Sequence, residues 1–357
     1  MRPTLSTQAA SSVFPVLPVL PVRSARSLRS LRSATSAQRD GQRGAALLTA
    51  MIIVSLIATL SAGMLWQQWR AVQVEVAERS QSQAVWILKG ALDWARLLLR
   101  EDARNGGPDH LGEPWATPLA EARLSTFLAA DRNNTDDAPE AFLSGAIIDA
   151  QSRYNLRNVV VGGKVVPVEL ASLKRLCELV GQDPAVADRL TEALRLAQPG
   201  NTADVGAAAN TEPPLMPERI DDLAWLGLPA ASVQALLPHL VLLPRVTALN
   251  LNTASRIVLA AVIPGADLAS AERLIQLRQR NPLKNREDAA TALGGTAKLD
   301  AARVGVSSSF FEVVGRLRAD QMVVTQRSLV ERNSNLEVKV IYTQREPSDT
   351  STLARAP

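Results

Sequence analysis

The chain has 357 residues, which is enough for one large domain or two ordinary ones. Hydrophobic residues make up 46% of it and aromatic residues only 4%, so we expect a mainly aliphatic core. The single cysteine, Cys177, excludes an intrachain disulfide, and its place in the apolar pattern "LKRLCELV" predicts a small buried side chain. The formal net charge is +4, but residues 1–44 hold seven arginines and one acid. The remaining 32 basic and 34 acidic residues give a net charge of −2, which argues against a nucleic-acid-binding protein.

Residues 1–44 form a basic leader, and residues 45–66 that follow carry no charged side chain. The prolines of "VFPVLPVLPV" forbid a membrane helix inside the leader. The uncharged run, in contrast, is long enough to cross a bilayer. Trp66 and Arg70 stand where aromatic and basic side chains favour the membrane interface, and the arginines would keep the leader in the cytoplasm. We therefore predict a transmembrane helix at 45–66.

The helix is predicted to continue without a break through residues 67–105 and to become amphipathic. Two apolar rows run side by side at helical spacing. The first consists of Ile87, Ala91, Trp94 and Leu98, and the second of Leu88, Leu92, Ala95 and Leu99. We expect this broad stripe to pack on the protein's own sheet, with Trp94 buried there. The segment "RNGGPD" ends the helix because Gly-Gly-Pro cannot continue it.

The rest of the chain alternates between strand-like and helical patterns. Residues 106–165 contain apolar runs such as "AFLSGAIIDA" and are predicted to form the first part of a sheet. Residues 166–308 are helical, and several segments begin at Asp, Pro or Thr. Residues 309–345 alternate with a period of two, as in "FFEVVGRLRA" and "LEVKVIYT", which predicts a three-stranded antiparallel meander, and 346–357 form a polar tail. The order predicts an α+β fold in which the long helix packs on an antiparallel sheet with a large all-helical insertion.

An enzyme is not indicated by this sequence. His110 and His239 are the only histidines, and no Ser/His/Asp or Cys/His grouping has a supporting spacing. No glycine-rich phosphate loop is present. We predict structural roles for both histidines and no catalytic residue.

A DNA-binding hypothesis rests on the segment "LNLNTASRIVLAAVIPGADLASAERLIQLRQR", which resembles a helix-hairpin-helix unit. Such hairpins can present backbone amides to a phosphate. Here "IPGAD" has one glycine in place of the Gly-x-Gly turn. The other interpretation is a packing module in which Asn250, Asn252 and Thr253 cap turns and helices. A membrane-anchored DNA-binding protein of a competence-type system is thus the competing function.

The stretch "QRGAALL" before the apolar run resembles the class III signal of type IV pilins and their secretion relatives. The resemblance implies that a prepilin peptidase cuts between Gly44 and Ala45, that Ala45 is N-methylated and that the helix is kept. Thr49 stands at the fifth mature position, where pilins usually carry glutamate. Together with "LGEPWATPL", "IIDAQSRYNLRNV" and "ALNLNTASRIVLAAVIPG", this departure resembles the minor pseudopilin K family of the type II secretion system.

This resemblance implies a pseudopilin sheet that carries a helical insertion of SAM-like or helix-hairpin-helix type. It further implies a structural protein at the tip of a short periplasmic pseudopilus, where Thr49 serves assembly. The implied partners are the minor pseudopilins of the I and J types and the pseudopilus, the prepilin peptidase, the inner-membrane secretion platform and secreted cargo, with no nucleic acid. The chain would be a single-pass inner-membrane protein with its large C-terminal part in the periplasm.

Calcium is the one cofactor that the resemblance raises, because the family's helical domain is known for it. We associate those sites with an acidic loop in the middle of the insertion, where this chain offers only Asp204 and Glu212. The segment "DRNNTDDAPE" supplies Asp131, Asp136 and Asp137, and oxygen ligands of this kind suit calcium. A solvated acidic loop is the competing interpretation, so these five residues are candidate ligands only.

Overall fold

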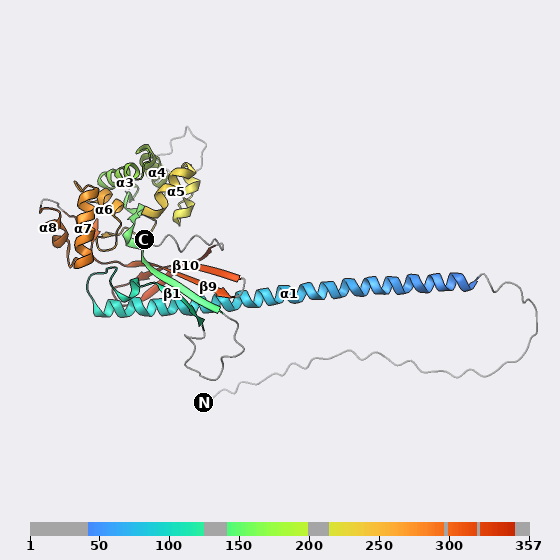
Figure 1. The fold of residues 1–357 in the computed structure, drawn as a ribbon. Coiled ribbons are helices and arrows are strands. Elements are labelled where there is room, and N and C mark those ends of the chain that lie inside the picture. The colour runs from blue at the N-terminus through green and yellow to red at the C-terminus, as the bar shows by residue number, and fades with distance from the viewer. Residues whose placement is uncertain (1–41, 125–140, 199–213, 296–298, 320–321, 347–357) are drawn as a thin grey trace, which may run out of the picture. The chain divides into compact units, whose positions relative to one another are not determined.

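The computed structural model describes residues 42–124, 141–198, 214–295, 299–319 and 322–346 (Figure 1). The chain divides into two compact units, one ending at Val74 and the other beginning at Glu75. The long helix α1 (Gln42–Asn105) contributes to both units. The predicted long N-terminal helix is therefore confirmed.

The first unit contains the apolar part of α1. Within the described residues, α1 is the one helix that is long and apolar enough to cross a membrane. Its large side chains, such as Leu47, Ile52 and Leu56, are all more than half exposed. Leaving each of them in water forgoes about 1.5–3 kcal/mol of burial, so a lipid environment suits this segment. Both of its threonine hydroxyls are satisfied inside the helix, because Thr49 Oγ1 donates to the carbonyl of Ala46 and Thr59 Oγ1 to that of Leu56, each at 2.9 Å.

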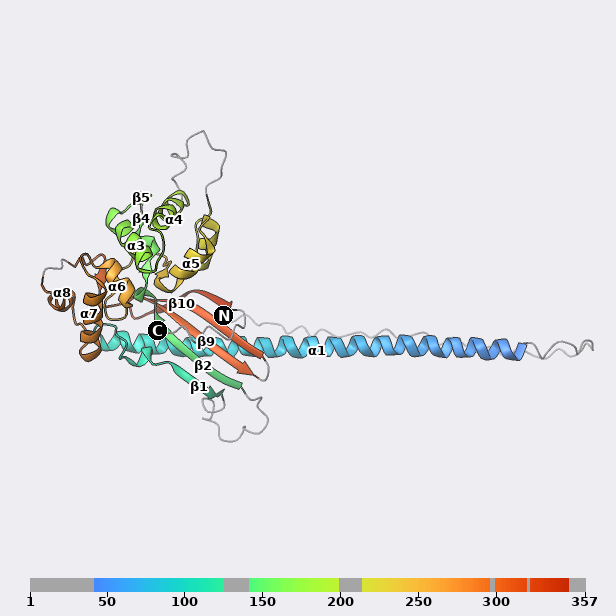
Figure 2. The ribbon, with the colours of Figure 1, turned by 45° about the horizontal axis from the view of Figure 1, so that its top comes forward.

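The second unit is built on a five-stranded antiparallel sheet with the order β1-β2-β9-β10-β11. The strands are β1 (Leu119–Arg123), β2 (Ala141–Asp149), β9 (Phe310–Ala319), β10 (Met322–Arg332) and β11 (Val338–Glu346). Strands β2 and β9 are neighbours, although the helical segments lie between them in the sequence. Figure 2 shows these strands running over α1. This arrangement confirms the α+β fold and the helical insertion.

The second half of α1 packs on the sheet through one row of small and aliphatic side chains. The buried members of this row are Ala84, Leu88, Leu92, Ala95 and Leu99. A close approach is possible because Gly145 and Gly315 face each other across β2 and β9. A Cβ atom at Gly315 would lie 3.1 Å from Leu88 Cδ2, and one at Gly145 would lie 2.6 Å from the carbonyl oxygen of Val314.

The prediction that Trp94 is buried against the sheet is wrong, because its side chain is 51% exposed. A straight helix contacts a sheet along one line. Consecutive residues of a helix are rotated by about 100° around its axis, so two rows offset by one residue face different directions. The row of Leu88 faces the sheet, so the row of Trp94 lies to its side.

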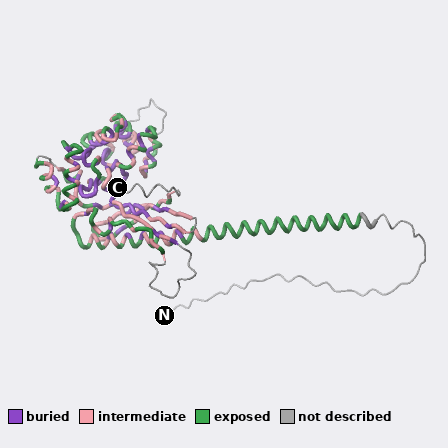
Figure 3. The backbone as a smooth tube through the Cα atoms, in the orientation of Figure 1, coloured by how far each residue is buried: buried purple, intermediate pink, exposed green. Residues whose placement is uncertain are grey.

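The helical part of the second unit contains α3 (Pro167–Leu179), α4 (Ala185–Leu196), η5 (Ile220–Leu226), α5 (Ala230–Leu236), η6 (Leu237–His239), α6 (Arg256–Val262), α7 (Leu268–Arg280) and α8 (Arg286–Ala292). Short strand pairs join β3 (Tyr154–Asn155) to β6 (Leu240–Val241), β4 (Val160–Val161) to β5 (Lys164–Val165), and β7 (Leu249–Asn250) to β8 (Val304–Gly305). Single turns of 3₁₀ helix form η1 (Pro114–Ala116), η2 (Ala150–Ser152) and η3 (Leu156–Asn158). The core is aliphatic and includes Cys177, which is fully buried as predicted. Figure 3 shows buried stretches both in the helical part and in the strands.

The sheet lies between α1 and the helical part, as the side chains of consecutive residues show. Phe311 packs with Leu92, Leu99 and Trp115 on the α1 side. The preceding residue, Phe310, packs with Val241 and Leu243 of the helical part. Successive side chains of a strand point to opposite faces, so β9 contributes to two cores at once.

Candidate functional site

Two regions of the second unit carry the features expected of a functional site: a buried polar junction between the sheet and the helical part, and an apolar cleft beside α1. The junction centres on the carboxylate of Asp149 at the end of β2, which is 1% exposed. It accepts hydrogen bonds from Thr253 Oγ1 at 2.6 Å, Ser308 Oγ at 2.7 Å and Asn250 Nδ2 at 2.9 Å. Asn250 and Thr253 lie just before α6, so this one carboxylate ties the helical part to the sheet.

Burial raises the pKa of Asp149, while the donated hydrogen bonds, that of Thr253 first, act in the opposite direction. A buried carboxylate is tolerated only where such donors replace water. The sequence prediction for Asn250 and Thr253 was incomplete. The Asn250 side chain does accept a turn hydrogen bond from the backbone N–H of Asn252 at 2.9 Å, but its amide also bridges to Asp149.

A second carboxylate, Asp109, extends the junction to the end of α1. The Arg332 guanidinium at the end of β10 donates to Asp109 and, at 2.6 Å, to Asp102 of α1. The backbone N–H of Ser308 donates to Asp109 Oδ2 at 2.6 Å. Arg332 also lies over the ring of Phe311, with its central carbon 4.8 Å from the ring centroid. Burial raises the pKa of Asp109 to about 6, against the lowering effect of Arg332.

Asp102, Asp109 and Glu113 bring carboxylate oxygens within 4.8 Å of one another, which is close enough to share a metal ion. Protein donors already occupy them. Arg332 pairs with both aspartates, and Glu113 Oε2 accepts from Trp115 Nε1 at 2.8 Å and from the backbone N–H of His110 at 2.9 Å. The group is therefore explained as a structural junction.

Amide side chains of the segment after β2 fasten the chain that leads into α6. Asn155 Nδ2 donates to the carbonyl of Arg245 at 2.8 Å, and Asn158 Nδ2 donates to the carbonyl of Thr247 at 2.8 Å. Gln151 Nε2 does the same to Ala248 at 2.8 Å. In the sequence alone, these amide residues look like interruptions of a strand-like run. Their regular occurrence inside an otherwise apolar stretch was the signal for a buried network.

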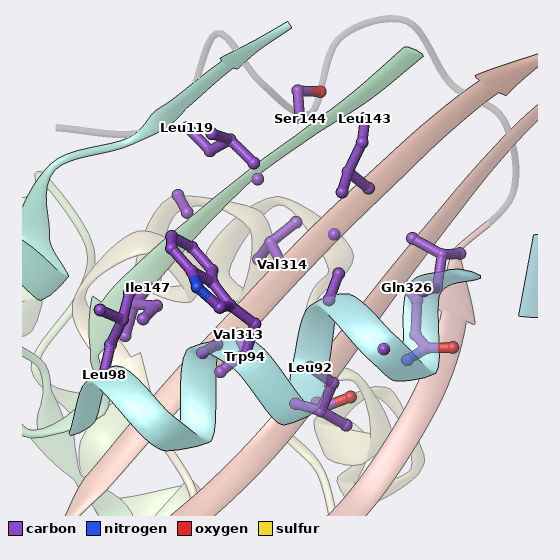
Figure 4. Close-up of a pocket in the computed structure, with 18 of the residues that line it drawn as sticks. Leu92, Trp94, Leu98, Leu119, Leu143, Ser144, Ile147, Val313, Val314 and Gln326 are labelled. Carbon is purple, nitrogen blue, oxygen red and sulfur yellow. The ribbon is translucent and has the colours of Figure 1, made fainter. Parts of the chain in front are cut away.

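The apolar cleft lies beside α1 and has a volume of about 630 Å³. Figure 4 shows Trp94 and Leu98 of α1 across from Leu119, Leu143 and Val313 on the strands. Trp86 and Leu97 on the same helix are also more than half exposed. A contiguous apolar surface of this kind is typical of a contact with another protein.

The structure leaves the predicted processing residues untested. Gly44 and Ala45 lie near the start of α1, and Thr49 is exposed on the same helix. The calcium candidates Asp131, Asp136, Asp137, Asp204 and Glu212 all lie outside the described residues. Cleavage, methylation and calcium binding therefore stay predictions.

The two histidines lie in a turn and in a short helix, respectively. His110 Nδ1 accepts a turn hydrogen bond from the backbone N–H of Gly112 at 3.1 Å. His239 is in η6, and burial lowers its pKa.

Comparison with known proteins identifies the family. Family models described as "Type II secretion system (T2SS), protein K" match residues 249–307 and 152–245. The Type II secretion system protein K of Pseudomonas aeruginosa is 28% identical over 325 residues, which cover 85% of this chain and 92% of that protein. The protein of the same name from Klebsiella pneumoniae is 30% identical over 259 residues, 66% of this chain and 75% of that protein. The chain belongs to the type II secretion system protein K family.

A solved structure supports the fold of this protein K family member. It is the crystal structure of the GspK-GspI-GspJ complex from the enterotoxigenic Escherichia coli Type 2 Secretion System, with a TM-score of 0.59 and 17% identity. The match covers 76% of this chain and 99% of that chain. The family models fall on the helical part and on the junction residues Asn250 and Thr253. The sequence-based recognition of the family is thus confirmed.

Proposed function

We propose that this protein is the minor pseudopilin at the tip of the type II secretion pseudopilus, where it initiates assembly and supports export across the outer membrane. Its apolar helix would anchor it in the inner membrane as a single span, with the C-terminal part in the periplasm. The inserted helical domain would extend over residues 166–308. It acts as a structural component, and DNA binding in a competence-type system is the disfavoured alternative.

The observation that carries the tip position is the helical insertion between β2 and β9. It packs on the face of the sheet that α1 does not cover, through Phe310 and Leu329. A subunit that carries a second domain on its sheet resists stacking beneath copies of itself, whereas the end of a filament leaves room for it. Thr49 suits that end, because a tip subunit has no neighbour above it whose N-terminus needs a carboxylate.

Antibody labelling of sheared pseudopili tests this position. An antibody against the helical insertion should decorate one end of each filament. Decoration along the length would contradict the tip proposal, and an antibody against the major pseudopilin provides the control for access.

The apolar cleft is our candidate for the lateral contact with minor pseudopilins of the I and J types. The related crystal structure is that of a complex of GspK, GspI and GspJ. Trp94 supports this role because a half-exposed tryptophan beside an apolar cleft is the kind of residue that dominates binding energy at interfaces. The prepilin peptidase, the inner-membrane secretion platform and secreted cargo would be further partners.

Photo-crosslinking in secreting cells tests the lateral contact. A photoreactive residue at position 94 should form adducts with the I- and J-type pseudopilins. Trp225 on η5 is 58% exposed and serves as a matched control position. Equal adducts from both positions, or none from position 94 in cells that accumulate the protein, would refute the assignment.

A further inference from the structure

Helix α7 and the segment from Lys284 to the start of α8 carry a cluster of cations that form no close ion pair within the described residues. Several other arginines of the second unit pair closely with carboxylates, as Arg303 does with Glu169 at 2.7 Å and Arg153 with Glu312 at 2.7 Å. Within the described residues, no ion pair of 4.0 Å or less involves any of five cations in this segment, which are Arg273, Arg278, Arg280, Lys284 and Arg286. Figures 1 and 2 both place α7 and α8 near the C-terminal end of α1.

The hydrogen bonds of these side chains within the described residues go to neutral groups, and Arg273 also interacts electrostatically with Asp267. Arg273 Nη2 donates to Ser270 Oγ at 2.9 Å, and Arg278 Nη1 donates to the carbonyl of Leu251. Burial lowers the pKa of Arg278 to about 10, which reflects a partly buried cation with no counter-charge.

Three of these cations, Arg273, Arg280 and Lys284, line a cavity together with the apolar side chain of Leu277. Arg273, Gln276, Leu277 and Arg280 share one face of α7, because residues three, four and seven positions apart lie together on a helix. With Lys284 and neighbouring residues they line a cavity of about 440 Å³. Leu277 at its centre is 42% exposed.

The backbone around this cavity is held in place by the core. Ala271 and Leu274, on the opposite face of α7, are fully buried. The side chain of Asn252 binds both backbone groups of Leu283, accepting from its N–H at 2.9 Å and donating to its carbonyl at 3.0 Å. The Asp267 side chain caps α7 by accepting from the N–H of Ser270 at 2.7 Å. A surface that is already ordered loses little entropy on binding.

We propose that this face, defined by Arg273, Leu277, Arg280 and Lys284, binds an acidic protein segment that inserts an apolar side chain beside Leu277. Its carboxylates would pair with the surrounding cations. A polyanion such as DNA fits less well, because Asp288 lines the cavity and Glu272 lies 3.7 Å from Arg256 on the adjoining surface. A continuous row of phosphates would meet these carboxylates, whereas a protein segment can place its acids to avoid them.

A binding assay on the full chain in detergent tests the proposal. The probe is a fluorescent peptide of four Glu-Glu-Leu repeats, and the same peptide with Gln for Glu is its neutral match. The acidic peptide should bind and the neutral one should not, and added salt should weaken binding because it screens the charges. Since pseudopilus assembly plays no part in this assay, its failure would leave the proposed function standing.

Two variants with the same change in net charge separate a specific site from general attraction. R280E/K284E should weaken binding of the acidic peptide by about tenfold or more, since two charge pairs become repulsive. K164E/R189E changes two exposed cations on β5 and α4 and should alter binding less than about twofold. All four positions are exposed, so melting curves should match the parent protein and show that both variants fold.

Two results would overturn the proposal. One is equal weakening by both double variants, which would mean non-specific attraction. The other is tighter binding of duplex DNA or phosphatidylglycerol vesicles than of the peptide, with loss of that binding in R280E/K284E. The variant Leu277→Ala tests the apolar contact separately. Peptide binding that does not weaken in this variant would show that Leu277 is not the apolar anchor.

Discussion

Replacing Arg332 with methionine should destabilise the second unit strongly and in a pH-dependent way. Methionine keeps the aliphatic packing near Phe311 but removes the positive charge. The Arg332 side chain is 11% exposed, and its partners Asp102 and Asp109 are 14% and 3% exposed. Removal of one partner from a buried ion pair leaves an uncompensated charge and typically costs about 3–5 kcal/mol.

The pH dependence follows from the pKa of Asp109. Its pKa is raised to about 6, and the loss of Arg332 would raise it further, because Arg332 is the larger of the lowering influences. Below that pKa the carboxyl binds a proton and no longer needs a cation. The loss of stability in R332M should therefore approach the full value at pH 8 and shrink at pH 5.

Chemical and thermal unfolding of the full chain in detergent measures this loss. For a unit of this size, about 3–5 kcal/mol corresponds to a fall in Tm of roughly 6–20 °C. The matched control is Arg104→Met, which breaks an exposed pair with Glu101 and should cost about 1 kcal/mol or less. A loss in R332M no greater than in this control, or equal at pH 5 and pH 8, would refute our account of the junction.

Three further predictions concern other parts of the molecule. The folded-state pKa of Asp109 is raised from 3.8 to about 6, so the contribution of this carboxyl to stability is present below pH 3.8 and is lost as the pH rises through 6. Unfolding curves measured between pH 4 and 7 should therefore lose about 3 kcal/mol of their pH dependence in the variant Asp109→Asn. Leu88→Ala should cost about 3–5 kcal/mol, and Trp94→Ala should cost less despite its larger side chain, since only Leu88 is buried; equal losses would contradict the assigned helix face. Excess calcium should leave Tm close to its value in chelator. Calcium bound at a concentration a hundred times its dissociation constant would instead add about 2.7 kcal/mol to the free energy of unfolding, and a rise in Tm lost on mutating Asp204 or Asp136 would locate the site.

Much of the fold was predictable because its determinants are local. The absence of Pro and Gly from residues 67–89, the period of two in the last strands and the capping residues of the helical part each act within a few residues. The prediction that α1 carries an apolar stripe packed on the sheet was also correct. Its orientation was not, because Leu88 and Trp94 belong to adjacent rows, and packing on the sheet decides which row is buried.

The junction could not be predicted from such local patterns. Asp109, Asp149, Asn250, Ser308 and Arg332 come from distant parts of the chain and meet only after β2 and β9 pair. Each looks like an ordinary turn, cap or strand residue in its own neighbourhood. The sequence carried one indirect signal, which was the density of Asn, Asp and Gln in otherwise apolar segments. Buried polar side chains of this type require partners, and their identities depend on tertiary structure.

The N-terminus of the protein extracted from membranes tests the pseudopilin account most directly. Intact-mass measurement and N-terminal peptide sequencing should find a chain that begins at Ala45, carries one methyl group on its amine and retains the apolar helix. A chain that still carries Arg43, or one that begins after Trp66, would contradict the account.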